Sequence, residues 1–369
     1  MKCTPLPLLL CAVFLLSGCG MNTKLDSLTM TLTLGLDVTD DGKLLMYSSS
    51  PVFNKDAKEH TEVIEVDASS LREGRYKVDL FASGRTVGGK IQNVVIGKKL
   101  VQQKELLSFL DVLYRDPKNS TTALLIIYDG PVKELIESKQ KDKPRLAVAI
   151  KDLITTTALD KQTVKTNLLD FHRTLFEKGC MPFASEMAMK NGKMTVKGVA
   201  LFNNKGKYVT SLSSKESAFL QLLRNEIKPA IPFTLRTSAL TGNGKKENIS
   251  VSLEHGKVRY QTRYRNDRFQ FHIHIDAGTI ITEEVVNVDM RKKQKQLEKM
   301  IAKEIENKTK ALIKTFQKHE IDPIGFGLYA RAYEYRKWKK VENDWGKAFA
   351  AADISVSAKV NIISYGVIN

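Results

Sequence analysis

Residues 258–275 read VRYQTRYRNDRFQFHIHI and show the clearest structural pattern in the chain. Mostly apolar or aromatic side chains occupy every second position on both sides of Asn266-Asp267, and arginine, glutamine and histidine occupy the positions between them. Strict alternation is typical of a half-buried β-strand, and a short polar pair between two such strands favours a tight turn. The stretch therefore predicts a β-hairpin with an apolar inner face and a basic, polar outer face.

The sequence around this hairpin extends the same unit. Residues 249–253 predict another strand, and the alternation over residues 354–362 predicts a last one. Residues 290–317 predict a long amphipathic helix whose other faces are rich in lysine. The apolar stripe of this helix consists of Leu297, Ile301, Ile305, Leu312 and Phe316. A further helix with one buried face is predicted from the spacing of Trp338, Val341, Trp345 and Phe349.

The N-terminal half predicts strands and helices in mixed order. Strands are expected at residues 28–36, 44–47, 63–66, 78–81 and 94–96, and helices at 105–115, 146–154 and 164–178. Residues 123–128 are continuously apolar, which is typical of a central strand covered on both faces. Residues 194–202 and 208–212 predict a second hairpin, followed by a helix that begins at a capping box of Ser213 and Glu216.

Length and element order together predict an α+β fold of mixed sheets with packed helices. A chain of 369 residues exceeds the size at which one hydrophobic core usually keeps growing, so two to three domains are expected. The expected divisions are a signal peptide at 1–18, an N-terminal α/β domain at 19–184, a small middle domain or connecting region at 185–230, and a C-terminal α+β domain at 231–369.

The first residues predict an export signal. Lys2 precedes an apolar run over residues 8–16, which is of signal-peptide length and shorter than the about 20 residues of a membrane span. Leu16-Ser17-Gly18-Cys19 matches a bacterial lipobox, so processing is expected to leave Cys19 as a lipid-modified N-terminus. A diacylglyceryl group supplies the two acyl chains that stable anchoring needs. The alternatives are an ordinary secretory signal with a chance cysteine, and an uncleaved anchor.

Charge and cysteine content narrow the classes of function. The formal net charge of +17 suits contact with anionic phospholipid beside such an anchor, and it equally suits a scattered basic surface. Nucleic acid is not an expected partner outside the cytoplasm. Only Cys19 and Cys180 lie beyond the signal, so no disulfide framework is expected, and Cys180 is expected to be a buried or half-buried thiol.

One strand carries a cluster of potential metal ligands. His272, His274 and Asp276 would share the polar face of the hairpin. The cations of the same face are Arg259, Arg263, Arg265 and Arg268. Because these charges repel a metal ion, no metal site is expected. No nucleophile and base stand together in the sequence either, so we assign no catalytic residue and no cofactor, and we expect no enzyme.

Two basic surfaces are candidates for contact with a protein partner or with lipid headgroups. The first is the outer face of the hairpin, with Arg259, Arg263, Arg265 and Arg268. The second is the start of the long helix, with Lys292, Lys295 and Lys299. The alternative for both surfaces is an ordinary solvated face.

Short motifs follow one another in a fixed order along the chain. Leu34-Gly35-Leu36-Asp37, Tyr114-Arg115-Asp116-Pro117 and Lys197-Gly198-Val199-Ala200-Leu201-Phe202 come after the lipobox. Asp322-Pro323-Ile324-Gly325-Phe326-Gly327 and then Trp338-Lys339 precede the last strand. In this order the chain closely resembles the C subunits of spore germination receptors, the GerAC or Ger(x)C lipoproteins. It departs from them after Cys19, where Gly20-Met21-Asn22-Thr23 replaces a Trp-Asp-Arg-like segment.

The resemblance implies a three-domain α+β lipoprotein on the outer face of the spore's inner membrane. It also implies assembly with two integral membrane subunits, A and B, to sense nutrient germinants and trigger germination. The family has no established catalytic residues, so none is transferred to this chain. One alternative is a solute-binding lipoprotein that captures a small nutrient in a pocket between domains, and another is a surface hydrolase.

Overall fold

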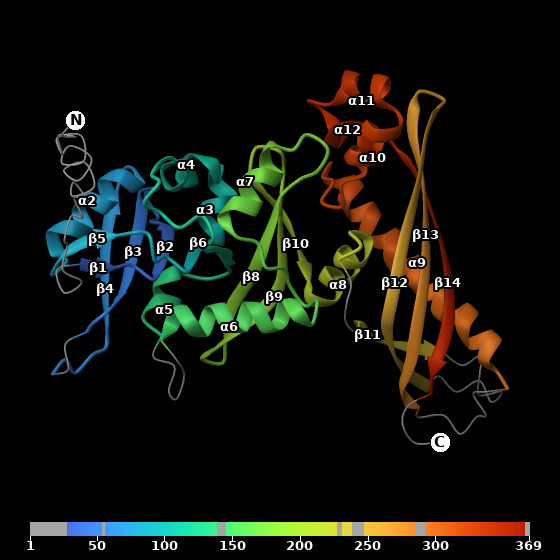
Figure 1. Ribbon diagram of the computed structural model, residues 1–369, viewed down its shortest axis with the longest axis horizontal. Helices are drawn as coiled ribbons and strands as arrows, with labels where there is room; N and C mark the ends of the chain where they lie inside the picture. The colour runs from blue at the N-terminus through green and yellow to red at the C-terminus, as the bar shows by residue number, and fades with distance from the viewer. Residues whose placement is uncertain are drawn as a thin grey trace, which may run out of the picture.

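The computed structural model describes residues 28–53, 56–138, 145–226, 231–237, 247–284 and 292–365. The predicted lipobox and Cys19 lie outside these residues. Figure 1 shows an elongated molecule in which an eight-stranded sheet and a four-stranded sheet occupy the two ends, with helix α8 (Ser214–Leu223) between them. Mixed sheets with packed helices confirm the predicted α+β class.

The larger sheet has the strand order β10-β9-β8-β7-β6-β2-β3-β4. Its strands are β2 (Thr33–Val38), β3 (Leu44–Pro51), β4 (Thr61–Ala68), β6 (Asn93–Gly97), β7 (Leu124–Tyr128), β8 (Phe183–Lys190), β9 (Lys193–Phe202) and β10 (Tyr208–Ser213). The four middle strands β2, β6, β7 and β8 run parallel, and the outer strands are antiparallel. All of β7 is buried between β6 and β8, which confirms the predicted central strand.

Helices cover both faces of the larger sheet. One face packs against α2 (Leu71–Phe81), α3 (Lys98–Gln103), α4 (Leu107–Arg115) and α7 (Leu168–Phe176). The other face packs against α5 (Val132–Ile136) and α6 (Leu146–Leu159). Successive side chains of β7 alternate between these two cores, as the period of a strand requires: Leu125 and Ile127 join the first, and Ile126 and Tyr128 the second.

The smaller sheet has the order β11-β12-β13-β14 and one covering helix. Its elements are β11 (Ile231–Thr237), β12 (Glu247–Arg265), β13 (Arg268–Glu284), β14 (Asp353–Ser364) and helix α9 (Gln294–Lys318). The β12–β13 turn is the predicted one, because Asn266 and Asp267 have φ values of 51° and 56°, as a two-residue hairpin turn needs. The predicted apolar stripe of α9 is buried.

The two sheets share one hydrophobic core at α8. That core includes Leu201 of β9, Leu220 of α8 and Ile273 of β13. The predicted capping box begins α8, since the Ser213 and Glu216 side chains each accept a bond from the other's backbone. Strands β8 to β10 extend the larger sheet beyond residue 184. The predicted domain divisions at residues 184 and 230 remain predictions.

Three predicted elements differ from the structure. The strand predicted at 28–36 is divided between β1 (Leu28–Met30) and β2, because residues 28–30 pair with β5 (Arg85–Val87) while β2 pairs with β3 and β6 in the larger sheet. Residues 78–81 end helix α2 instead of forming a strand, because Ser70 caps the helix and Leu71, Gly74 and Val78 are buried at helical spacing. The single helix predicted through Trp338 and Trp345 is two short helices, α11 (Tyr335–Val341) and α12 (Trp345–Ala350), preceded by α10 (Phe326–Tyr333). Both tryptophans are nevertheless buried, as predicted.

Candidate functional site

The outer sheet face is the side of β12, β13 and β14 that points away from α9. Side chains of the opposite phase, such as Phe271 and Ile273, are fully buried under α9. The register places Arg263 opposite Gln270 on β12 and β13, and it places His272 beside Ser355 on β13 and β14. Polar groups from three strands therefore converge on this face, as the alternation of the hairpin predicts.

The two histidines of this face belong to a hydrogen-bonded ladder. The His272 Nδ1 and Nε2 atoms lie 2.9 Å from Ser355 Oγ and 3.1 Å from Ser357 Oγ. The His274 Nδ1 and Nε2 atoms lie 3.0 Å from Ser357 Oγ and 3.2 Å from Asp276 Oδ1. Protein atoms thus engage all four ring nitrogens, and no group of three metal ligands occurs in the described part of the chain.

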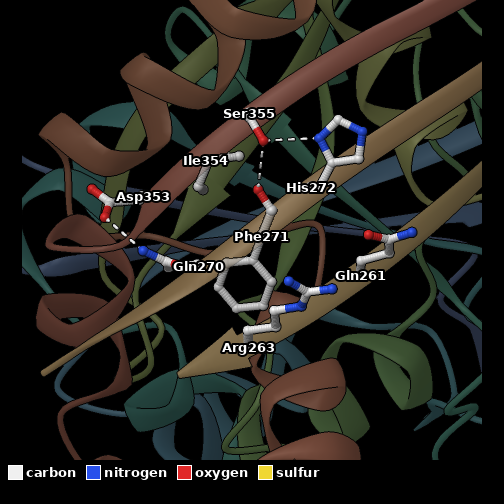
Figure 2. A pocket seen from close by; sticks show the side chains of 8 residues that line it. All are labelled: Gln261, Arg263, Gln270, Phe271, His272, Asp353, Ile354 and Ser355. Atoms are coloured by element: carbon white, nitrogen blue, oxygen red, sulfur yellow. Dashed lines mark hydrogen bonds between the residues drawn. The ribbon is translucent and has the colours of Figure 1, made fainter. Parts of the chain in front are cut away.

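A hollow of about 470 Å³ opens on the outer sheet face. Figure 2 shows that its lining side chains come from all three strands, with Arg263 and Gln261 on the β12 side and Ser355 on the β14 side. Gln270 donates to Asp353 across 3.4 Å, and Ser355 bonds His272. The hollow is lined mainly by polar groups that donate or accept hydrogen bonds, which suits binding of a polar surface.

The four predicted arginines lie on or beside this face and are exposed, but they differ in their partners. Arg259 pairs with Asp276 at 2.5 Å, and Arg268 pairs with Asp353 at 3.3 Å. Arg263 and Arg265 have no ion-pair partner among the residues that the structure describes. The hairpin end of the face therefore carries two guanidinium groups without an ion-pair partner among the described residues.

The predicted lysine surface lies elsewhere. Lys292, Lys295 and Lys299 are exposed at the start of α9, which covers the inner face of the same sheet. Glu298 of α9 accepts the Ile362 amide at 3.0 Å, which holds this end of the helix against β14. The structure therefore does not join the lysines and the arginines into one basic surface.

A second concavity lies between α8, β11 and α9. This cleft has a volume of about 840 Å³. Its apolar lining residues include Ala218, Phe219, Phe233, Ala311 and Leu312, and its charged lining residues are Asp160, Lys215, Glu216 and Lys308. Ser252 also lines it, is 4% exposed, and has a hydroxyl with no hydrogen-bond partner among the described residues. Sequence reasoning expected such a pocket only for a solute-binding protein and named none of these residues.

Sequence reasoning also missed the role of Asp322. Its side chain is fully buried and accepts bonds from the Gly325 amide at 2.8 Å, the Gly327 amide at 2.9 Å and the Trp345 indole at 2.8 Å. Burial raises the pKa of Asp322, and these three donors oppose the increase. The Asp322–Gly327 motif was noticed in the sequence, but it did not reveal the contact with Trp345, which is remote in sequence.

The same loop joins the two halves of the molecule. The Met181 amide donates to the Asp322 carbonyl at 2.9 Å, and Arg224 donates to the Pro323 carbonyl at 2.7 Å. Cys180, beside this contact, is buried as predicted, and burial raises the pKa of its thiol to about 11. Such a thiol is a poor nucleophile at neutral pH. Asp322 therefore helps to hold the contact between the two halves, and Cys180 is buried beside it.

Across the described ranges, no helix is both long and apolar enough to cross a membrane. The predicted lipidation of Cys19 stays a prediction, since that residue lies outside the structure.

Comparisons with known proteins agree along nearly the whole chain. The family described as "Spore germination protein N-terminal domain" matches residues 22–189, and the family described as "Spore germination B3/ GerAC like, C-terminal" matches residues 197–366. Spore germination protein GerQC of Bacillus cereus is 25% identical over 97% of this chain and 98% of its own length. Spore germination protein KC of Bacillus subtilis (strain 168) is 25% identical over 100% of this chain and 97% of its own. The crystal structure of the GerBC protein has the same fold, with a TM-score of 0.58, 17% identity, and coverage of 89% of this chain and 96% of that one.

Proposed function

This chain belongs to the Ger(x)C family of spore germination proteins, and we propose that it is the lipid-anchored C subunit of a nutrient germinant receptor. In this role a diacylglyceryl group on Cys19 holds it on the outer face of the spore's inner membrane. It binds integral membrane A and B subunits there, catalyses no reaction, and needs neither metal nor cofactor.

The outer sheet face is the observation that supports a docking role. Arg263 and Arg265 are exposed near the β12–β13 turn and lack ion-pair partners among the described residues, and Arg263 lines the hollow. Arginine is enriched at protein interfaces, and its planar group binds carboxylates through two parallel hydrogen bonds. An acidic loop of a membrane subunit is the partner that fits this surface.

Charge reversal tests this contact. We expect Arg263→Glu combined with Arg265→Glu to reduce recovery of the A and B subunits with the tagged chain at least tenfold, and to slow nutrient-triggered germination. Arg173→Glu is the control for charge reversal at another exposed arginine: its side chain is 79% accessible on α7, and its ion-pair partner, Asp170, lies on the same helix. If the double variant assembled normally with the A and B subunits, the outer sheet face would not be the surface that binds them.

The cleft beside α8 favours a second candidate function, direct capture of a small solute. Its volume falls in the range of about 300–1,000 Å³ that is typical of ligand sites, and an apolar floor with few polar groups is the usual composition. The unpartnered hydroxyl of Ser252 would gain a hydrogen bond from a polar ligand atom.

Thermal unfolding in the presence of single amino acids, nucleosides and sugars tests capture. A true ligand should raise the unfolding temperature of the wild-type chain, because it binds only the folded state. Ala311→Trp, which fills the cleft from α9, should abolish that increase. If no compound stabilises the wild type beyond the Ala311→Trp variant, solute capture is rejected while the docking role is untouched.

A further inference from the structure

Helix α2 has apolar side chains on two sides. Leu71, Gly74 and Val78 are buried against the larger sheet. Tyr76, Leu80 and Phe81 point to solvent, with 67%, 66% and 69% of their surfaces exposed. We call these three residues the α2 apolar edge. Single exposed apolar side chains are common, but here three occur within the last six residues of α2: Tyr76 and Leu80 share one side at i, i+4 spacing, and Phe81 ends the helix.

The α2 apolar edge lies beside the place where the chain enters the folded body. Strand β1 (Leu28–Met30), the first element described, pairs in parallel with β5 (Arg85–Val87), which follows α2 directly. The Gly84 amide donates to Thr29 Oγ1 at 3.2 Å and ties the connection after α2 to β1. Figure 1 shows α2, β1 and β5 together at one end of the long axis.

Chain length sets how far this end can lie from an anchored Cys19. Nine residues, 19–27, precede Leu28 in the sequence. A fully extended segment of that size spans roughly 30 Å. The inference rests on the proposed lipidation of Cys19: given that anchor, β1 lies within this reach of the bilayer, and the end of α2 is bound to β1.

The composition around the edge suits a membrane interface. Arg72 and Arg85 flank it, are exposed, and have no ion-pair partner among the described residues. Aromatic and leucine side chains enter the boundary between headgroups and acyl chains, and nearby arginines attract anionic lipid. A surface that binds a protein partner would not need to lie beside the lipid tether.

We propose that Tyr76, Leu80 and Phe81 insert into the headgroup region of the bilayer and, with the lipid on Cys19, form a second attachment that orients the molecule. Two attachment points fix the tilt of an elongated body, whereas one flexible tether leaves it free to rotate. The α2 end then faces the membrane, and the four-stranded sheet at the other end of the long axis is held away from it.

Tryptophan fluorescence on vesicles tests this proposal. The full lipid-modified chain is placed in phosphatidylglycerol–phosphatidylethanolamine vesicles with or without brominated acyl chains, which quench nearby tryptophan. Brominated lipid should quench the fluorescence of the Phe81→Trp chain at least twofold more than it quenches the fluorescence of the wild type. Tyr333→Trp is the matched control, because Tyr333 is 68% exposed on α10 at the far sheet, and it should be unaffected. The native Trp338 and Trp345 are buried and supply a constant background that the wild type measures.

Further variants separate insertion from mere proximity and from anchoring. Leu80→Asp added to Phe81→Trp should cut the quenching by at least half, because a carboxylate resists insertion. Equal quenching of Phe81→Trp and Tyr333→Trp in vesicle-bound chain would disprove the lipid contact. A protein would then be the partner that covers the α2 apolar edge. Mass spectrometry of the membrane-extracted chain tests the anchor independently: if Cys19 carries no diacylglyceryl group, the lipidation proposal fails whatever the quenching shows.

Discussion

Trp345 Nε1 donates a hydrogen bond of 2.8 Å to Asp322 Oδ2, and both side chains are buried. The same carboxylate accepts the amides of Gly325 and Gly327. One acidic group therefore fixes the start of α10 against the start of α12. This arrangement also places the loop so that its backbone meets residues 179–181 of the other half.

Trp345→Phe should lower the free energy of unfolding by about 2 kcal/mol more than Trp338→Phe, because only the first change removes a bond to a buried carboxylate. Trp338 is a matched control: it is equally buried, and its indole N–H has no acceptor among the described residues. Both changes remove the same volume. Urea denaturation of the two variants measures the difference, and equal losses would mean that the Asp322 bond adds no stability.

Asp322 should make stability depend on pH. Burial raises its pKa in the folded state, so the folded chain binds this proton more tightly than the unfolded chain does. The free energy of unfolding should then fall as pH rises from the unfolded-state pKa of about 3.9 to the higher folded-state value. Asp322→Asn has no proton to lose there and should lack this decline. Urea denaturation of both proteins between pH 4 and about 7 compares the slopes, and identical slopes would contradict the raised pKa.

Gly327→Ala should be strongly destabilising because the two halves touch at this glycine. A Cβ atom there would lie 2.6 Å from the Gly179 Cα and 2.8 Å from Trp345 Nε1. Forcing such an overlap costs about 1–3 kcal/mol. Gly278→Ala is the control, since its Cβ would meet nothing closer than 3.4 Å, and it should change stability by less than about 0.5 kcal/mol. Thermal denaturation of the two variants compares their losses of stability. Similar losses would mean that the backbone contact at Gly327 can shift at little cost.

Cys19→Ala should strongly reduce membrane retention and nutrient-triggered germination while leaving the fold intact. The physical reason is that the substitution would remove the two acyl chains of the proposed anchor and leave only the weaker contact proposed for the α2 apolar edge. Fractionation of spores, with circular dichroism of the purified variant, measures both effects. Normal germination by this variant would contradict the tethered-subunit proposal at its base.

Local patterns predicted much of the fold. The alternation at residues 258–275 identified the hairpin, its turn and its outer face, because a strand with one buried side needs that period. The stripe of α9 and the capping box of α8 were equally local. The strand predicted at 78–81 was wrong because α2 is apolar on two sides, which hides helical periodicity.

Other features depend on contacts between distant segments. Asp322 meets Trp345 and Met181 only after the chain has folded, so the motif contains its two local donors, Gly325 and Gly327, but does not reveal its burial or its third donor. Trp338 and Trp345 keep helical spacing across a break at residues 342–344, and spacing alone does not reveal such a break. The cleft needs α8, β11 and α9 to assemble, and no single segment encodes it.

The parallel pairing of β13 with β14 determines when this half of the molecule is completed during synthesis. Paired residues such as His272 and Ser355 are 83 positions apart, so one edge of the 17-residue strand β13 stays open until β14 has been made. Pairing over such a separation is slow, and an open strand edge recruits other chains. A product truncated before Asp353 should therefore aggregate, so this half depends on protection from self-association until β14 has been made.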